Sequence, residues 1–308
     1  MGTPEFAVAS LEALYQGGFD IAAVVTAPDK PAGRGLKMHV SEVKRYACAH
    51  DIPVLQPVRL KDPVFQQQLR SFEADIQVVV AFRMLPESVW DMPPLGTVNL
   101  HASLLPAYRG AAPINWAIIR GETETGVTTF KLQHEIDTGA VIYAERVAIG
   151  PEETAGSLHD RLMKTGAELI LKTLTAIGKG DYRLQPQEGL ADPAIREKTA
   201  PKLFREDGRI RWDSPGATVF NLIRGLSPYP GAWTVFNGKT LKIYRARMIG
   251  APGRLPPPGT VSSDGKTYIR IATGDGWIAL DELQLEGKKK MDTPEFLRGF
   301  RDAEMHTG

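Results

Sequence analysis

Asn99 and His101 stand one residue apart at the end of an apolar run, in the stretch TVNLHASLLPAYRGAAPI at 97–114. If strand geometry continues through them, both side chains point to the same face, because side chains alternate along a strand. An amide donor beside an imidazole that can carry charge forms a site for a developing oxyanion. The imidazole can also move a proton. The pair therefore indicates catalysis of a reaction that passes through an oxyanion.

Asp137, in the stretch HEIDTGAVI, is the third candidate for the same chemistry. Its carboxylate could orient the imidazole or accept a proton from a nucleophile. The chain offers no activated nucleophile of its own, which favours a reaction in which the substrate supplies one, such as transfer of a small acyl group to an amine. A buried histidine beside a turn asparagine, without a catalytic role, is the alternative at this point.

The elements that must position these residues alternate between helix and strand as far as residue 180, which is typical of an open, mostly parallel α/β sheet. Ligands of such sheets lie outside the carboxyl ends of the strands, where Asn99 and His101 stand. The predicted helices cover 3–18, 41–51, 62–75, 111–122 and 154–180. The predicted strands cover 20–29, 53–55, 76–82, 95–102, 125–133 and 139–149.

The start of the chain departs from this alternation. Thr3 is predicted to cap the first helix, with Pro4 at its first position and Gly17 and Gly18 at its end. A strand normally precedes such a helix, yet only Met1 and Gly2 do so here. We expect that the first strand is missing from this sequence because its start lies downstream of the natural one, since losing an inner strand would leave its neighbours without ladder partners.

The rest of the chain has a different pattern. Residues 181–201 are polar and aperiodic and are predicted to be a linker. Short alternating strands, including 208–212 and 239–249, follow over 202–308, with one helix near Pro215–Leu226. Turn signals such as Asn237-Gly238 separate them. The sequence predicts a small β-barrel domain there.

Composition narrows the class of protein. A single cysteine among 308 residues excludes an internal disulfide framework and a cysteine-rich zinc site. No run of 18 apolar residues and no basic-then-apolar leader is present, so we expect no membrane span and a cytoplasmic location. From Lys198 onward 18 Lys and Arg face 12 Asp and Glu, whereas 19 face 24 before it. A basic C-terminal third is typical of a polyanion-binding appendage, although a solvated surface explains it equally well.

Taken together, NLHASLLPAYRGAAPINWAI and GETETGVTTFKLQHEIDTGAVI closely resemble the folate-dependent formyltransferases, in particular their tRNA-formylating members. The resemblance implies an open Rossmann-like sheet followed by an OB-like β-barrel domain. It implies that Asn99, His101 and Asp137 are catalytic and that the formyl donor is 10-formyltetrahydrofolate. Neither a metal nor a covalent intermediate is needed. The residues that the resemblance places around the folate are Ser103, Leu104, Leu105 and Pro106, with Arg109, Gly110 and Pro113 shaping the loop.

The stretch after the buried strand departs from the family's pattern. Phe82, Arg83, Met84 and Leu85 stand where the family places contacts to the pterin. They resemble the Arg-Ile-Leu loop of glycinamide ribonucleotide formyltransferases more than the Tyr-Gly version of the tRNA enzymes. The resemblance nevertheless implies a pterin pocket at this position.

Basic residues indicate the acceptor substrate. The loop TAPDKPAGRGLK carries Lys30, Arg34 and Lys37 and is too rich in Gly and Pro for regular structure. In the tRNA-formylating enzymes a loop with this Pro-Ala-Gly-Arg-Gly core reaches the acceptor stem, where Arg34 would contact phosphates or unpaired bases. Further basic residues would form a phosphate-binding surface in the C-terminal domain. These are Lys239, Lys242, Arg245, Arg247, Lys288, Lys289 and Lys290.

The resemblance therefore implies initiator methionyl-tRNA and folate as partners, with no membrane and no obligate protein partner. A formyltransferase acting on a small amine, such as a 4-amino nucleotide sugar, is the alternative enzyme, and it gives Arg34 and the basic surface no role. An RNA-binding protein without catalysis and a formyl-folate hydrolase are the remaining alternatives.

Overall fold

The computed structural model describes residues 1–32, 37–190, 198–250, 253–299 and 306–307. The chain divides into two compact units, each built from several segments. The first comprises Met1–Gly110, Gly126–Val147 and His159–Thr199, and the second comprises Ala111–Thr125, Ala148–Leu158 and Ala200–Gly308. The boundaries expected from the sequence, at residues 180 and 202, stay a prediction.

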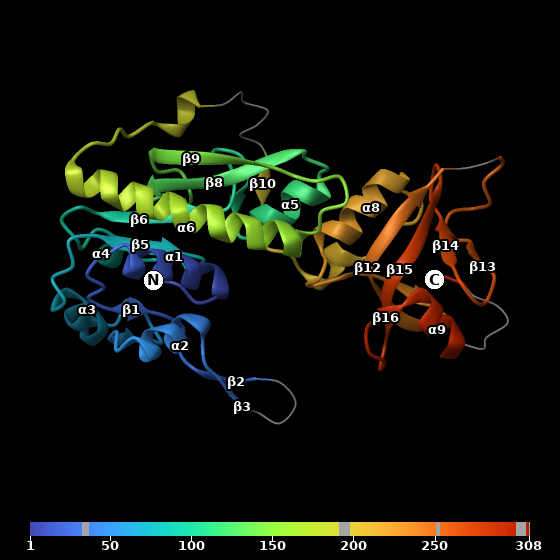
Figure 1. Cartoon of the computed structure of the whole chain (residues 1–308), viewed down its shortest axis with the longest axis horizontal. Helices are drawn as coiled ribbons and strands as arrows, with labels where there is room; N and C mark the ends of the chain where they lie inside the picture. The colour runs from blue at the N-terminus through green and yellow to red at the C-terminus, as the bar shows by residue number, and fades with distance from the viewer. Residues whose placement is uncertain (33–36, 191–197, 251–252, 300–305, 308) are drawn as a thin grey trace. The chain divides into compact units, whose positions relative to one another are not determined.

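The first unit contains alternating helices and strands (Figure 1). Its helices, including short 3₁₀ turn η1, are α1 (Glu5–Gln16), α2 (Glu42–Ala49), α3 (Pro63–Arg70), α4 (Glu87–Trp90), most of α6 (Ala155–Lys179) and η1 (Gln187–Gly189). Its strands are β1 (Val24–Val25), β2 (Lys30–Ala32), β3 (Lys37–His39), β4 (Val54–Leu55), β5 (Gln77–Val80), β6 (Thr97–His101), β7 (Arg109–Gly110), most of β8 (Glu124–Lys131) and of β9 (Val141–Ala148). The division between the units falls within the short β10 (Thr199–Ala200).

The strands of this unit confirm the predicted α/β class. β1 and β4 pair in parallel, and so do β5 and β6, whereas β8 runs antiparallel to β6 in the order β5-β6-β8-β9. Helix α6 packs on this sheet, where Ile170 and Leu174 join a buried cluster with Val98 of β6 and Ile142 of β9. Figure 1 shows α6 running across the face of these strands. Strand β6 is therefore flanked by β5 and β8, and α6 covers one face of the sheet.

Met1 and Gly2 lie between β1 and β5. The Gly2 amide donates to Val25 O at 3.0 Å, and the Val80 amide donates to Met1 O at 2.9 Å. A Cβ on Gly2 would lie 2.4 Å from the Ala7 Cβ, so only glycine fits this crossing point. Met1 and Gly2 therefore connect β1 and β5 ahead of α1, and Gly2 forms an isolated parallel bridge with Val80.

Local caps explain where several helices begin. Ser41 caps α2 by accepting the Lys44 amide at 3.1 Å, and serine is among the residues preferred at this position. The predicted cap of α1 is wrong by one residue, because Pro4 stands at the N-cap and no side chain caps it. Pro4 has extended ψ, and its carbonyl accepts the first helical bond from Ala7 at 2.9 Å.

The basic loop at 26–37 was predicted to lack regular structure. That prediction is wrong for Lys30–Ala32 and for Lys37, which lie in β2 and β3. β2 and β3 pair antiparallel, with Lys30 opposite His39 and Ala32 opposite Lys37. Proline is tolerated in such a pair where its nitrogen is not needed by the ladder, which reconciles Pro31 with a strand. The hairpin extends away from the rest of its unit (Figure 1).

The second unit is built on an antiparallel sheet. The strand order is β11-β12-β15-β14-β13, with β16 beside β15, so the sheet forms a half-barrel. Its strands are β11 (Ala232–Phe236), β12 (Lys239–Ile249), β13 (Val261–Ser263), β14 (Ile269–Ala272), β15 (Trp277–Leu285) and β16 (Met291–Asp292). Its helices are α5 (Pro113–Ile119), η2 (Arg205–Gly208), α8 (Gly216–Gly225) and α9 (Thr293–Gly299).

Turn chemistry predicted much of this unit. Asn237 and Gly238 both have positive φ, 45° and 74°, as the primed two-residue turn between β11 and β12 requires. The strand expected at 208–212 does not form, because Arg209 makes only an isolated bridge with Trp233. Over the described residues, no helix combines the length and apolarity needed to cross a bilayer.

Candidate active site

Strand β6 places Asn99 and His101 at the centre of their sheet. Asn99 lies opposite Val79 of β5 and Phe130 of β8, and His101 lies opposite Thr128. His101 is buried and Asn99 is half-buried. Within the part of the chain that the structure describes, no hydrogen bond engages the Asn99 amide side chain. Its N–H groups are therefore available to a ligand on the face that it shares with the imidazole.

The imidazole of His101 is oriented by a backbone carbonyl. Nε2 lies 2.9 Å from Tyr108 O, which can only accept, so Nε2 carries a proton and donates it. The other ring nitrogen, Nδ1, lies 3.9 Å from Asp137 Oδ2. That distance is too long for a hydrogen bond but short enough for strong attraction between an imidazolium and a carboxylate. Proton exchange is therefore confined to Nδ1, the nitrogen that faces Asp137.

Asp137 reaches this position through its own backbone. Its φ is 54°, in the left-handed region that Asp visits more readily than most residues. Oδ2 accepts the amide proton of Gly110 at 3.0 Å. The Asp137 and His101 side chains are 12% and 8% exposed, so water screens their interaction only weakly. The structure thus brings together the three residues that the sequence predicts as catalytic, with an amide, an imidazole and a carboxylate at one strand end.

The loop after β6 is built from internal bonds. Ser103 is fully buried, and its hydroxyl donates to Ala107 O at 2.6 Å. Thr128 Oγ1 donates to Ser103 O at 2.6 Å. Leu105 packs with Phe130 and the start of β9. Of the four residues predicted to line the folate site here, Ser103, Leu105 and Pro106 are buried and Leu104 is half-buried, so the loop is closely packed within its unit.

The predicted pterin contacts Phe82–Leu85 begin two residues after the end of β5, which lies beside the end of β6 because Val80 pairs with Leu100 in parallel register. Arg83 donates to the carbonyls of Pro57 and Val58, the latter at 3.0 Å, and burial lowers the pKa of its guanidinium. Leu85 is buried in the core, whereas Phe82 is half-buried. Met84 is 75% exposed, which leaves an apolar side chain beside the catalytic strand end.

The predicted tRNA-contacting residues fall in both units. Lys30 is exposed on the β2–β3 hairpin and Lys37 begins β3, whereas Arg34 lies outside the described residues. In the second unit, Lys288, Lys289 and Lys290 are exposed together before β16. Lys289 pairs with Glu295 at 2.9 Å and Lys290 with Glu282 at 2.8 Å.

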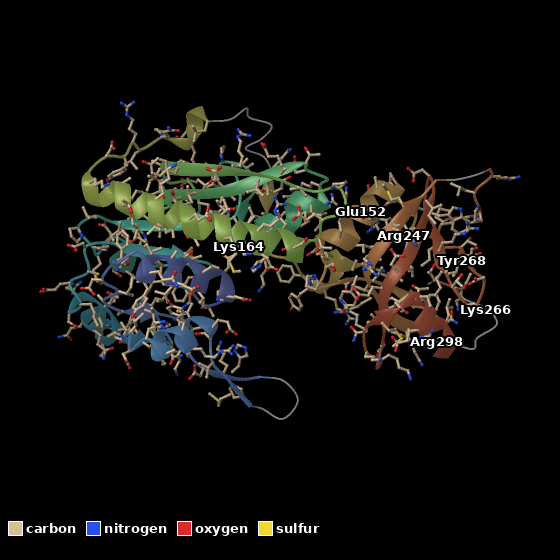
Figure 2. All side chains as sticks on the ribbon, viewed as in Figure 1. Glu152, Lys164, Arg247, Lys266, Tyr268 and Arg298 are labelled. Carbon is tan, nitrogen blue, oxygen red and sulfur yellow. The ribbon has the colours of Figure 1, made fainter. Side chains whose placement is uncertain are left out.

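The other predicted basic residues are partly engaged. Lys242 donates to Pro230 O at 2.8 Å. Arg247 and Arg245 line a cavity of about 570 Å³ in the second unit, together with Tyr268. Figure 2 labels Arg247 and Tyr268 among the side chains of this unit. Arg247 forms a two-pronged pair with Asp281, with contacts of 2.9–3.1 Å, and this pair raises the pKa of the guanidinium. The carboxylate therefore neutralises much of its charge.

Sequence reasoning missed three groups that orient the site. Two are backbone groups, the Tyr108 carbonyl and the Gly110 amide, which carry no residue-type signal. The third is the side chain of Gln187, which donates to Asp137 O at 2.9 Å. Gln187 lies in the predicted linker at 181–201. Nothing in that polar, aperiodic sequence indicates that one of its glutamines is buried.

The comparisons with known proteins identify the family. Residues 1–174 match the formyl transferase family, and 202–301 match the formyl transferase C-terminal domain. The methionyl-tRNA formyltransferase of Bacteroides thetaiotaomicron is 52% identical over 307 residues, which cover 98% of this chain and 94% of the relative. That of Bacteroides fragilis (strain ATCC 25285) is 51% identical over 305 residues, which cover 97% and 94%.

A solved structure supports the fold alone. The sugar 3N-formyl transferase WlaRD, determined in the presence of dTDP and 5-N-formyl-THF, is 21% identical with a TM-score of 0.66. The match covers 94% of this chain and 97% of that one. The chain therefore belongs to the formyl transferase family, and the two relatives compared above, which it matches over nearly their full length, are methionyl-tRNA formyltransferases.

Proposed function

We propose that the protein transfers the formyl group of 10-formyltetrahydrofolate to the α-amine of methionyl initiator tRNA, in the cytoplasm. The observation that carries the proposal is the arrangement at the end of β6, where Asn99 and His101 share a face and Asp137 lies 3.9 Å from the imidazole. The identity of about half of all residues with methionyl-tRNA formyltransferases supports the choice of acceptor.

The residues at this sheet edge fit a folate. An exposed Met84 and a half-buried Phe82 would give apolar contacts suited to a flat ring, and the loop 103–106 follows β6 at the strand end that carries His101. Backbone groups of 82–85 would recognise the polar edge of the ring. When bound, the folate supplies the formyl carbon that the amine attacks.

Asn99 and His101 would stabilise the negative charge that develops on the formyl oxygen. Because Nε2 is committed to Tyr108 O, the proton available to that oxygen is on Nδ1. Asp137 lies too far from Nδ1 to accept this proton in a direct hydrogen bond, and its negative charge attracts a protonated imidazole across the 3.9 Å gap. The imidazolium can therefore be stabilised by Asp137 and still donate to the substrate.

Asp137 would also receive the proton that the amine releases. Attack by an amine leaves an ammonium, which must lose a proton before the formyl group can remain on nitrogen. The Asp137 carboxylate is anchored by Gly110 through Oδ2. We expect Asp137 to take this proton through a water molecule. As the oxyanion collapses, the bond between the formyl carbon and the folate nitrogen breaks, and that nitrogen receives the proton as tetrahydrofolate leaves. The reaction needs no metal and no covalent intermediate with the protein.

The basic residues would bind the tRNA. Arg34, Lys30 and Lys37 belong to the segment predicted to reach the acceptor stem, and Lys288–Lys290 form an exposed basic cluster in the second unit. Phosphate contacts of this kind make binding fall with salt. A small-amine acceptor, such as a 4-amino nucleotide sugar, would give these residues no role.

Formyl transfer to purified methionyl initiator tRNA tests the proposal. The reaction is run with 10-formyltetrahydrofolate, with wild-type protein and His101→Ala, at two salt concentrations. Product that requires His101 and decreases at high salt supports the proposed reaction. Free formate, or a formylated small amine without formylated tRNA, would instead indicate a hydrolase or a sugar formyltransferase.

A further inference from the structure

Gln187 is a fully buried side chain in a stretch that is otherwise mostly exposed. It begins η1, and its neighbours at 183–186 and 188–190 are all exposed. Burying an amide is unfavourable unless its donors and acceptor are hydrogen-bonded. The partners of Gln187 therefore explain why it is buried.

All the hydrogen-bonding capacity of this amide is used within the candidate active site. Nε2 donates to Asp137 O at 2.9 Å and to Gly139 O at 2.8 Å. Oε1 accepts from Arg109 Nε at 3.1 Å and from Arg109 Nη2 at 2.6 Å. Two donors and two lone pairs exhaust a glutamine side chain. Gln187 thus joins the segment 137–139 to Arg109.

The two segments that Gln187 joins also meet at the catalytic carboxylate. Gly110, the residue after Arg109, donates its amide to Asp137 Oδ2 at 3.0 Å. Gln187 holds the backbone carbonyl of Asp137 directly. Through Arg109 it also holds the neighbouring Gly110, whose amide donates to the Asp137 carboxylate. These contacts set the 3.9 Å separation between Asp137 Oδ2 and His101 Nδ1.

Gln187 is itself anchored by the chain next to it. The amide of Gln185 donates to Val141 O at 2.8 Å, and the amide of Val141 donates to Gln185 O at the same distance. Val141 begins β9, so this segment lies along the end of a strand in the main sheet. The side chain of Gln185 is exposed, which makes it a matched control.

We propose that Gln187 is a positioning residue for formyl transfer, which acts through Asp137 and Arg109 and does not touch the reacting atoms. The inference rests on the proposed function of Asp137. Only a neutral amide can donate to two carbonyls and accept from a guanidinium at one point. A carboxylate would lose both donated bonds, and a leucine would leave all three partners unsatisfied.

The test combines Gln187→Leu and Gln187→Glu with a double-mutant cycle. Misplacing Asp137 by about 1 Å should lower kcat about 10²-fold, while KM for folate and for tRNA stays within about twofold. In an Asp137→Asn background, measured in single turnover, Gln187→Leu should cause little further loss, because its effect passes through Asp137. Gln185→Leu should match the wild type.

The outcomes separate the two proposals. An inactive wild type would refute the proposed function. An active wild type with unchanged kcat in both folded Gln187 variants would refute the inference alone. Losses that add fully in the Asp137→Asn background would also refute it, since a merely structural role lowers activity independently of Asp137. Gln187→Glu keeps the volume and the pairing with Arg109, so the test remains decisive if the leucine variant does not fold.

Discussion

The imidazole of His101 donates its Nε2 proton to the carbonyl oxygen of Tyr108, 2.9 Å away. Tyr108 is 5% exposed and has φ of 60°, a conformation that bulky residues seldom adopt. The chain thus turns its carbonyl toward the histidine in a strained conformation within the loop after β6. The consequence is that acid–base chemistry at His101 takes place at Nδ1 alone.

The neutral tautomer of His101 follows from this contact. We expect the neutral imidazole to carry its single proton on Nε2 and none on Nδ1. ¹⁵N-resolved NMR of histidine-labelled protein, with His101→Asn used for assignment, measures the protonated nitrogen at alkaline pH. A resonance pattern with the proton on Nδ1 would contradict the role of Tyr108.

Asn99→Ala should lower kcat by about 10²–10³-fold, because it removes one donor to the developing oxyanion. Binding of both substrates should change little, since the amide acts mainly in the transition state. Steady-state kinetics with varied folate and tRNA separates the two effects. Gln68→Ala, an exposed amide on α3, is the control and should retain wild-type activity. An Asn99 variant that changes only KM would place the amide in substrate binding instead.

Much of the fold could be predicted because its signals are local. Apolar periodicity located α6 and β6, and Asn237 with Gly238 marked a turn by their backbone preferences. The prediction of a strand at 208–212 was wrong. The alternating pattern is a local property of the sequence, whereas a strand forms only if distant residues pair with it.

The residues of the site were likewise predictable only where the residue type itself carries the signal. Asn99, His101 and Asp137 were predictable because catalysis requires their residue types. The Tyr108 carbonyl and the Gly110 amide were not, because every residue has these groups and only the folded loop aims them. Gln187 was not, because its partners are distant in sequence and its own segment has no periodicity.

The carboxylate of Asp29 offers a pH test at the base of the β2–β3 hairpin. Lys44 Nζ lies 2.5 Å from Oδ2 and Gln56 Nε2 lies 2.8 Å from Oδ1, and these bonds lower the pKa of Asp29. A carboxyl with a lowered pKa in the folded state stabilises the fold above its unfolded pKa, near 4. That stabilisation is lost as pH falls through the folded value.

Lys44→Met should therefore raise the pKa of Asp29, measured by carboxyl ¹³C NMR. The difference in unfolding free energy between variant and wild type should be greatest above about pH 5 and should shrink toward pH 3. Lys61→Met is an exposed control. An Asp29 titration that is unchanged by Lys44→Met would show that the ion pair does not form in solution.

Gly139 stands where the chain enters β9, and a side chain there has no room. A Cβ would lie 1.6 Å from Lys131 O, a backbone atom that cannot move without disrupting β8. Gly139→Ala should destabilise the fold by several kcal/mol, at the upper end of single substitutions, where about 4–5 kcal/mol is exceptional. Urea unfolding measures it.

The matched substitution is Gly178→Ala, in α6, where an added Cβ meets nothing within 4 Å. It should stabilise the protein by about 0.5–1 kcal/mol, since alanine has the higher helix propensity. Equal effects at the two glycines would contradict the close approach of β8 and Gly139.

Lys288 and Lys290 should differ in how they respond to salt, although they are two residues apart. Lys290 pairs with Glu282, and its ammonium lies 4.9 Å from the centre of the Tyr244 ring. Among the described residues, no carboxylate pairs with Lys288. An unpaired lysine that reaches a phosphate releases a counterion from the nucleic acid, whereas a paired one must first leave its carboxylate.

Lys288→Ala should therefore lower the slope of log Kd for tRNA against log salt by about 0.7–0.9, and Lys290→Ala should lower it less. Filter binding over a range of salt concentrations measures both, with Lys179→Ala, at the end of α6, as a control with an unchanged slope. Identical slopes for the three variants and the wild type would exclude this cluster from the tRNA interface. A larger effect from Lys290 would mean that its pair with Glu282 opens on binding, because only a lysine freed from its carboxylate can neutralise a phosphate.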